Sequence, residues 1–111
     1  MGILKTALRA REKKQKDLIH DALKEAGRVS GVLIKKFGAS EVKLYGSLLE
    51  KEHFEETSDI DLAVKGLGDR YLGAFGYCLR MSEYDLDIRQ YEDLPERIKS
   101  TIDEKGLKLY G

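Results

Sequence analysis

The chain of 111 residues carries 20 Lys and Arg against 20 Asp and Glu, so its formal net charge is zero, and we expect one domain over residues 1–111. The balanced charge argues against binding of nucleic acid by bulk attraction, and the single cysteine, Cys78, excludes an internal disulfide framework and a cysteine-only zinc site. No apolar run approaches the roughly 20 residues of a membrane span, and charges soon interrupt the N-terminus, so we expect a cytoplasmic protein without a signal peptide or a membrane partner.

The first third of the chain is predicted to be helical. Apolar residues recur at three- and four-residue steps over residues 18–37, and Gly38 follows at a good position for a C-cap. A continuous helix over about residues 4–37 would be about 50 Å long, which exceeds the width of so small a domain. Its N-terminal turns must therefore project, bend or fray. If they project, three apolar side chains become candidates for a contact between subunits: Ile3, Leu4 and Leu8. The alternative is a solvated, partly disordered arm.

Alternation of apolar and polar residues predicts the strands. The first runs from Glu41 to Tyr45, the second covers residues 59–65 and the third runs from Glu83 to Tyr91. Residues 47–58, between the first two, are expected to be a short helical or irregular segment and a loop. A short closing strand is expected over residues 107–110.

Two further helices are expected. One runs from Asp69 to about Met81, with three residues facing inward: Leu72, Phe75 and Leu79. The other has Pro95 at its start and ends at Gly106. The resulting order predicts an α+β (mixed α/β) fold, a small mixed β-sheet with helices packed on one face.

Aspartates gather on one face of the second and third predicted strands. Asp59 and Asp61 are two residues apart and therefore point to the same side, and Asp85 and Asp87 repeat this spacing. Aspartate is depleted in strands, and neighbouring carboxylates repel each other unless a cation lies between them. Oxygen ligands of this kind suit Mg²⁺ or Mn²⁺. A third carboxylate from the neighbouring strand would complete a two-metal site for in-line phosphoryl transfer.

Gly46 and Ser47 end the first predicted strand and supply complementary chemistry. A glycine lets the backbone approach a phosphate closely, and the following N–H groups and the Ser47 hydroxyl can donate to phosphate oxygens. Gly-Ser and Asp-x-Asp are each weak signals. A strand, Gly-Ser, a short segment and then Ser-Asp-Ile-Asp-Leu in a strand are together much more specific.

The segments Leu44-Tyr45-Gly46-Ser47 and Thr57-Ser58-Asp59-Ile60-Asp61-Leu62-Ala63-Val64 resemble the signature of the DNA polymerase β-like nucleotidyltransferase superfamily. The short length points to the minimal nucleotidyltransferases within it, and the resemblance covers most of the chain from about Leu18. It implies the polymerase β-like nucleotidyltransferase fold, two Mg²⁺ ions held by three carboxylates, with Mn²⁺ as a substitute, and a nucleoside triphosphate donor, for which ATP is expected.

The resemblance also implies roles for individual residues. Asp59 and Asp61 would ligate metal and act in catalysis. Gly46, Ser47 and Ser58 would contact the nucleotide.

The third carboxylate of the family lies on the strand before the last helix, with apolar neighbours. Asp87, between Leu86 and Ile88, fits that description as a metal ligand and catalytic residue. Asp85, on the same face, is the alternative.

The activity that the resemblance implies is transfer of a nucleoside monophosphate, AMP if the donor is ATP, to an acceptor hydroxyl. Minimal nucleotidyltransferases often pair with a small helical HEPN protein as antitoxin and toxin, so the resemblance implies a HEPN partner that bears the acceptor. The alternative is a weakly active or inactive module of the same fold that neutralises a partner by contact. That alternative draws on Glu50-Lys51, where the family often has Arg-Gly, and on the long N-terminal helix. Single-stranded nucleic acid is not an expected partner, because the acidic face should repel phosphates without metal.

Overall fold

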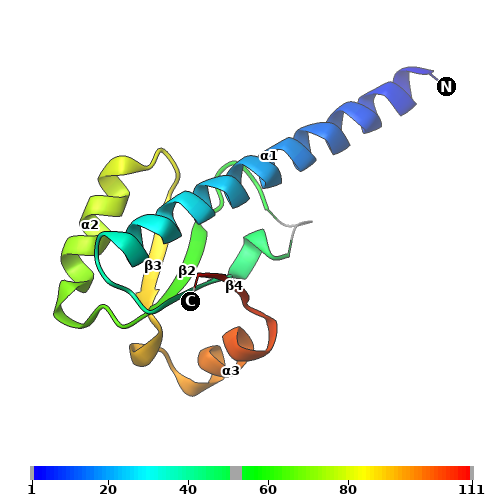
Figure 1. Ribbon diagram of the computed structural model, residues 1–111. Helices are drawn as coiled ribbons and strands as arrows, with labels where there is room; N and C mark the ends of the chain where they lie inside the picture. Colours follow the sequence, from blue (N-terminus) through cyan, green and yellow to red (C-terminus); the bar gives the residue numbers. More distant parts are fainter. Residues whose placement is uncertain (1, 51–53, 111) are drawn as a thin grey trace.

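The computed structural model describes residues 2–50 and 54–110, and this part of the chain forms three α-helices and one four-stranded sheet (Figure 1). The helices are α1 (Gly2–Lys35), α2 (Tyr71–Met81) and α3 (Glu96–Lys105). The strands are β1 (Glu41–Tyr45), β2 (Ile60–Lys65), β3 (Leu86–Gln90) and β4 (Leu107–Tyr110). Short 3-10 turns connect them: η1 (Gly46–Leu48), η3 (Gly68–Arg70) and η4 (Tyr91–Asp93).

The sheet is mixed, with the strand order β3-β2-β1-β4. Strand β1 is antiparallel to both β2 and β4, whereas β2 and β3 are parallel. In this register Asp61 lies beside Tyr45 of β1 on one side and beside Asp87 of β3 on the other. The α+β class and the mixed sheet are as the sequence predicts.

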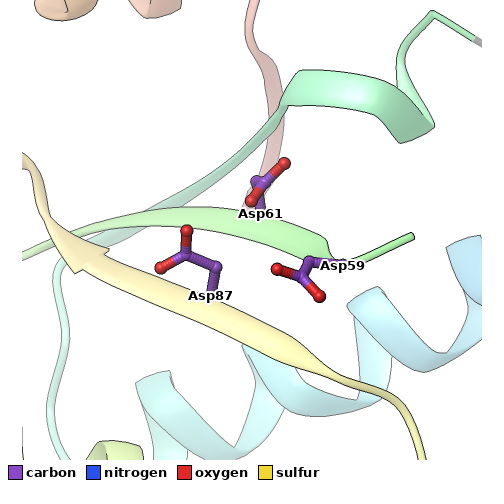
Figure 2. A group of neighbouring side chains, drawn as sticks. All are labelled: Asp59, Asp61 and Asp87. Atoms are coloured by element: carbon purple, nitrogen blue, oxygen red, sulfur yellow. The ribbon is translucent and has the colours of Figure 1, made fainter. Parts of the chain in front are cut away.

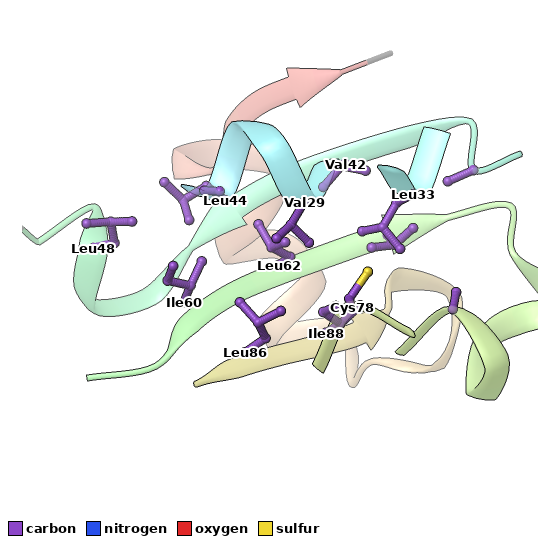
Figure 3. Packing of buried hydrophobic residues seen from close by; sticks show 14 of the residues in the cluster. Val29, Leu33, Val42, Leu44, Leu48, Ile60, Leu62, Cys78, Leu86 and Ile88 are labelled. Atoms are coloured by element: carbon purple, nitrogen blue, oxygen red, sulfur yellow. The ribbon is translucent and has the colours of Figure 1, made fainter. Parts of the chain in front are cut away.

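The main core lies between α1, α2 and one face of the sheet (Figure 3). Ile60, Leu62 and Val64 of β2 are fully buried there, as their alternation predicts. Helix α1 contributes a stripe at helical spacing, in which small residues let the helix approach the sheet closely: Ala22, Ala26, Val29 and Leu33.

Helix α3 covers part of the opposite face of the sheet, so the prediction that the helices pack on one face is wrong. Ile102 of α3 is fully buried and packs with Ala63 and Leu94 in a second, smaller cluster. Figure 1 shows α1 and α3 on opposite sides of the sheet. The reason is that the face bearing the aspartates is only partly polar, because Ala63 and Tyr45 give it an apolar patch that α3 covers.

The inward face of α2 also differs from the prediction. Leu72 and Leu79 are 78% and 45% exposed, whereas Ala74 and Cys78 are fully buried and Phe75 is partly buried. Helix α2 is apolar on nearly every side, so its sequence offers two apolar stripes and hydrophobic periodicity cannot choose between them.

Helix α1 projects beyond the rest of the molecule (Figure 1). With this helix included, the molecule measures 58 × 30 × 20 Å. Residues 2–14 are exposed, with Ile3 89% and Leu4 69% exposed. The root of this arm is held by the Gln15 side chain, which donates to the Phe54 carbonyl at 2.7 Å. Of the three alternatives that the sequence leaves open, the helix projects and does not bend or fray. The contact between subunits through Ile3, Leu4 and Leu8 stays a prediction. No helix in the described ranges is long and apolar enough to cross a membrane.

The Cys78 thiol gives a test of the core. It is fully buried, and burial raises the pKa of this thiol to about 11. At pH 8 only about one thiol in a thousand would be ionised in the folded protein, so alkylation should be at least about a hundredfold slower than in the unfolded chain. Mass spectrometry after timed exposure to iodoacetamide, with and without guanidinium, measures this. Equal labelling rates would contradict the packing of α2.

Candidate metal centre

Three carboxylates meet where β2 begins beside β3 (Figure 2). Asp61 lies in β2, Asp59 immediately precedes that strand, and Asp87 lies in β3. Alternation along β2 puts Asp59 and Asp61 on one face, and the parallel register puts Asp87 beside Asp61. One oxygen from each of the three lies within 4.8 Å of the others.

The register also separates the two candidates for the third carboxylate. Leu86 pairs with Ile60, so Asp87 falls beside Asp61. Asp85 precedes β3 and is exposed, and its backbone carbonyl accepts a hydrogen bond from the Ile60 N–H at 2.9 Å. Within the described residues, the acidic cluster contains Asp87 and not Asp85.

The three carboxylates repel one another. The pKa of Asp61 rises from 3.8 to about 6, first because the carboxyl is buried and then because of the charges of Asp87 and Asp59. The nearby Arg89 guanidinium acts against this rise. An acidic group held at a raised pKa by its neighbours gains free energy when a cation binds.

The three carboxylates suit a divalent metal ion, because all of their donor atoms are oxygens. Mg²⁺ and Mn²⁺ prefer carboxylate oxygens. Two oxygens bound to one Mg²⁺ at about 2.1 Å are at most about 4.2 Å apart. Small side-chain rotations would therefore bring Asp59, Asp61 and Asp87 from their present separation into coordination distance.

Gly46 closes the cluster from the side of β1. Its φ is +78°, in the left-handed region that favours glycine. A Cβ on this residue would overlap with Oδ2 of Asp61 and lie 2.9 Å from its Cγ. The glycine is therefore needed for Asp61 to fit under turn η1, a role beyond the phosphate contact that the sequence predicts.

The two serines predicted to contact nucleotide are placed differently. Ser47 follows Gly46 in η1 and is partly exposed, and the fully buried Leu48 anchors that turn. The Ser58 hydroxyl accepts a hydrogen bond from the Glu55 N–H at 2.9 Å, so it holds the turn that leads to Asp59. Lys51 lies outside the described residues.

Two neighbours of the cluster were missed by sequence reasoning. Arg89 forms an ion pair with Asp87, and the only signal for it was the two-residue spacing that places both on one face of β3. Tyr45 is partly buried, and its burial raises the pKa of the phenol to about 12.

An open hollow of about 610 Å³ lies between η1 and α3, beside the cluster. Gly46, Tyr45 and Leu49 line one part of it, and Arg97 and Lys105 of α3 line another. A phosphate-bearing ligand held at Gly46 would therefore have two cations within the same hollow.

A scan against protein-family models and a search of curated proteins found no match to this chain. The residues of the cluster and their surroundings are therefore the guide to what this chain does.

Proposed function

We propose that this protein is a metal-dependent nucleotidyltransferase with the polymerase β-like fold. It transfers a nucleoside monophosphate, AMP from ATP, to an acceptor hydroxyl and releases pyrophosphate. The observation that carries the proposal is the convergence of Asp59, Asp61 and Asp87 within 4.8 Å, beside a Gly-Ser turn that ends the neighbouring strand.

Different residues of the chain would bind the metal ions, hold the phosphates and accept the proton. Asp59, Asp61 and Asp87 would hold two Mg²⁺ ions, which when bound neutralise the charge of the phosphates. The backbone N–H groups at the start of η1 and the Ser47 hydroxyl donate to phosphate oxygens. The acceptor oxygen forms a bond to the α-phosphorus as the bond to pyrophosphate breaks, and the Asp87 carboxylate accepts the acceptor's proton.

The acceptor in this proposal is presented by a protein partner in the cytoplasm, and a small helical HEPN protein is the class implied by the sequence resemblance. The projecting arm of α1 supports a protein partner, because Ile3 and Leu4 are largely exposed on it. Residues 54–58 connect the root of the arm to Asp59, so a partner that contacts the arm would have to extend past its root to reach the cluster.

The same exposed arm also supports a second function, a module that neutralises its partner by contact alone. The two functions differ in their dependence on Asp59 and Asp61. If the doubly substituted protein, with Asp59→Asn and Asp61→Asn, still neutralises a co-expressed partner fully, contact is the mechanism.

Label transfer tests the enzymatic proposal. The protein is incubated with α-³²P-labelled nucleoside triphosphates, Mg²⁺ and a small helical protein of the HEPN class as the acceptor. We expect label from ATP to appear on that protein only with Mg²⁺, and to fall at least about a hundredfold with Asp59→Asn. Asp69→Asn, in turn η3, is the matched control and should transfer normally. Absence of Mg²⁺-dependent ATP binding in calorimetry would rule out the enzyme.

A further inference from the structure

Two guanidinium nitrogens of Arg89 contact the carboxylate of Asp87. Its Nε donates to Oδ1 at 3.2 Å, and its Nη2 lies 3.2 Å from Oδ2. The two residues are two positions apart on β3, so both side chains leave the same face of the sheet. The guanidinium therefore occupies both oxygens of a carboxylate that the acidic cluster contributes to metal binding.

Other cations of the sheet are engaged elsewhere. Lys43, Lys65 and Lys108 all lie near the carboxylate of Glu41, with Nζ to oxygen distances of 3.9, 3.3 and 3.5 Å. Arg89, by contrast, pairs with Asp87, a carboxylate of the cluster itself. Among the residues that the structure describes, Arg89 is the cation that pairs with a carboxylate of the cluster.

The ion pair between Arg89 and Asp87 is partly exposed to solvent and can be displaced. The Arg89 side chain is 50% exposed and that of Asp87 is 30% exposed. Ion pairs with this much solvent contact are weak. A divalent ion at the cluster would compete for the Asp87 oxygens and repel the guanidinium.

We propose that Arg89 is an exchangeable counter-ion of the metal centre. It pairs with Asp87 while metal is absent, and metal binding releases its guanidinium to the phosphates of the nucleoside triphosphate. Metal and triphosphate then favour each other's binding. The Arg89 guanidinium competes with the metal for Asp87, and once the metal displaces it, it can bind the triphosphate. This inference rests on the proposed function and assigns to Arg89 two successive contacts in it, first with Asp87 and then with the phosphates.

The test compares two ligands by calorimetry, Mn²⁺ alone and inorganic triphosphate in the presence of saturating Mg²⁺. With Arg89→Gln, we expect Mn²⁺ to bind about five- to tenfold more tightly, because a competing positive charge is gone. Triphosphate should bind about tenfold more weakly, because a charge-assisted contact is lost. A merely structural role for Arg89 would not move the two affinities in opposite directions.

Two further variants sharpen the comparison. Arg80→Gln removes the same charge from the exposed face of α2 and should leave both affinities within about twofold of the wild type. Arg89→Lys keeps the charge without the two-pronged geometry, so its affinity for Mn²⁺ should lie between those of the wild type and Arg89→Gln. Circular dichroism and a melting curve establish that each variant is folded.

The failures of the two proposals are distinguishable. If Mn²⁺ binding is lost with Asp59→Asn but is the same in Arg89→Gln as in the wild type, the counter-ion role is wrong and the metal centre stands. Tighter Mn²⁺ binding without weaker triphosphate binding overturns the release of Arg89 to the phosphates. If Mn²⁺ binding does not depend on Asp59 at all, the metal centre and the role of Arg89 are both wrong.

Discussion

Replacing Asp61 by asparagine should abolish nucleotide transfer and, at the same time, stabilise the metal-free protein. Asparagine keeps the shape of the side chain but removes the charge that would bind metal. Metal-ion catalysis contributes several kcal/mol to transition-state stabilisation, so we expect transfer to fall at least about a thousandfold. The same substitution should raise the free energy of unfolding of the metal-free protein, because the three carboxylates repel one another when no cation neutralises them.

The pH dependence of stability follows from the same carboxyl. The pKa of Asp61 in the folded, metal-free protein is about 6, above its ordinary 3.8, so the folded state binds this proton more tightly than the unfolded chain does. The stabilisation from that proton is complete below about pH 4 and is lost as the pH rises through about 6. A pKa rise of this size corresponds to about 2–3 kcal/mol, which solvent screening of a partly exposed carboxylate reduces to roughly 1–2 kcal/mol.

Melting curves in EDTA measure this effect. At pH 7.5 the Asp61→Asn protein should melt roughly 5 °C above the wild type, and the difference should vanish near pH 4. Subtracting one profile from the other removes the contribution of Glu25 and Glu41, whose pKa values are lowered. Saturating Mg²⁺ should raise the melting temperature of the wild type only. An Asp61→Asn protein that is less stable than the wild type in EDTA would show that the carboxylates do not repel one another.

The cluster itself was within reach of sequence reasoning, because two simple rules determine it. Alternation puts Asp59 and Asp61 on one face of a strand, and the buried alternation of Leu86 and Ile88 puts Asp87 on the matching face of the next. The choice between Asp87 and Asp85 needed the register of β2 against β3. That register depends on packing between strands, which one strand's sequence does not contain.

The buried face of α2 and the direction of the Arg89 side chain could not be predicted, because the sequence allows several arrangements and tertiary packing selects one. Leu72 and Leu79 could face inward as well as Ala74 and Cys78 could, and the packing of α2 against α1 and β3 decides between them. Likewise, the spacing of Asp87 and Arg89 indicates that they share a face, but not that the guanidinium turns toward the carboxylate and not to solvent. Long flexible side chains carry such ambiguity in any sequence.

Replacing Gly46 by alanine should damage both the fold and the metal centre. The φ of +78° costs an L-residue about 1–2 kcal/mol, and the added Cβ would overlap with Oδ2 of Asp61. Because β1 and β2 are paired at this point, the carboxylate must rotate away or the end of β1 must shift. We expect a loss of at least about 2 kcal/mol in the free energy of unfolding, together with at least about tenfold weaker Mn²⁺ binding.

Gly68 provides a matched control for this prediction. Its φ is +58°, and an added Cβ there would have nothing within 4 Å, so Gly68→Ala carries the backbone cost without the collision. Urea unfolding should therefore show a smaller loss for Gly68→Ala than for Gly46→Ala, with unchanged Mn²⁺ binding. Equal losses for the two variants would mean that the collision with Asp61 is relieved at no cost.

A double-mutant cycle isolates the contact between Gly46 and Asp61. In an Asp61→Ala background the carboxylate is gone, and the nearest remaining atom to a new Cβ at position 46 is the Cβ at position 61, at 3.2 Å. This contact is tight, but a shift of a few tenths of an ångström relieves it. The cost of Gly46→Ala should then fall to about that of Gly68→Ala. Such coupling would mean that the Gly-Ser turn and the second aspartate of the cluster constrain each other physically. The spacing between them would then be a requirement of packing as well as of phosphate binding.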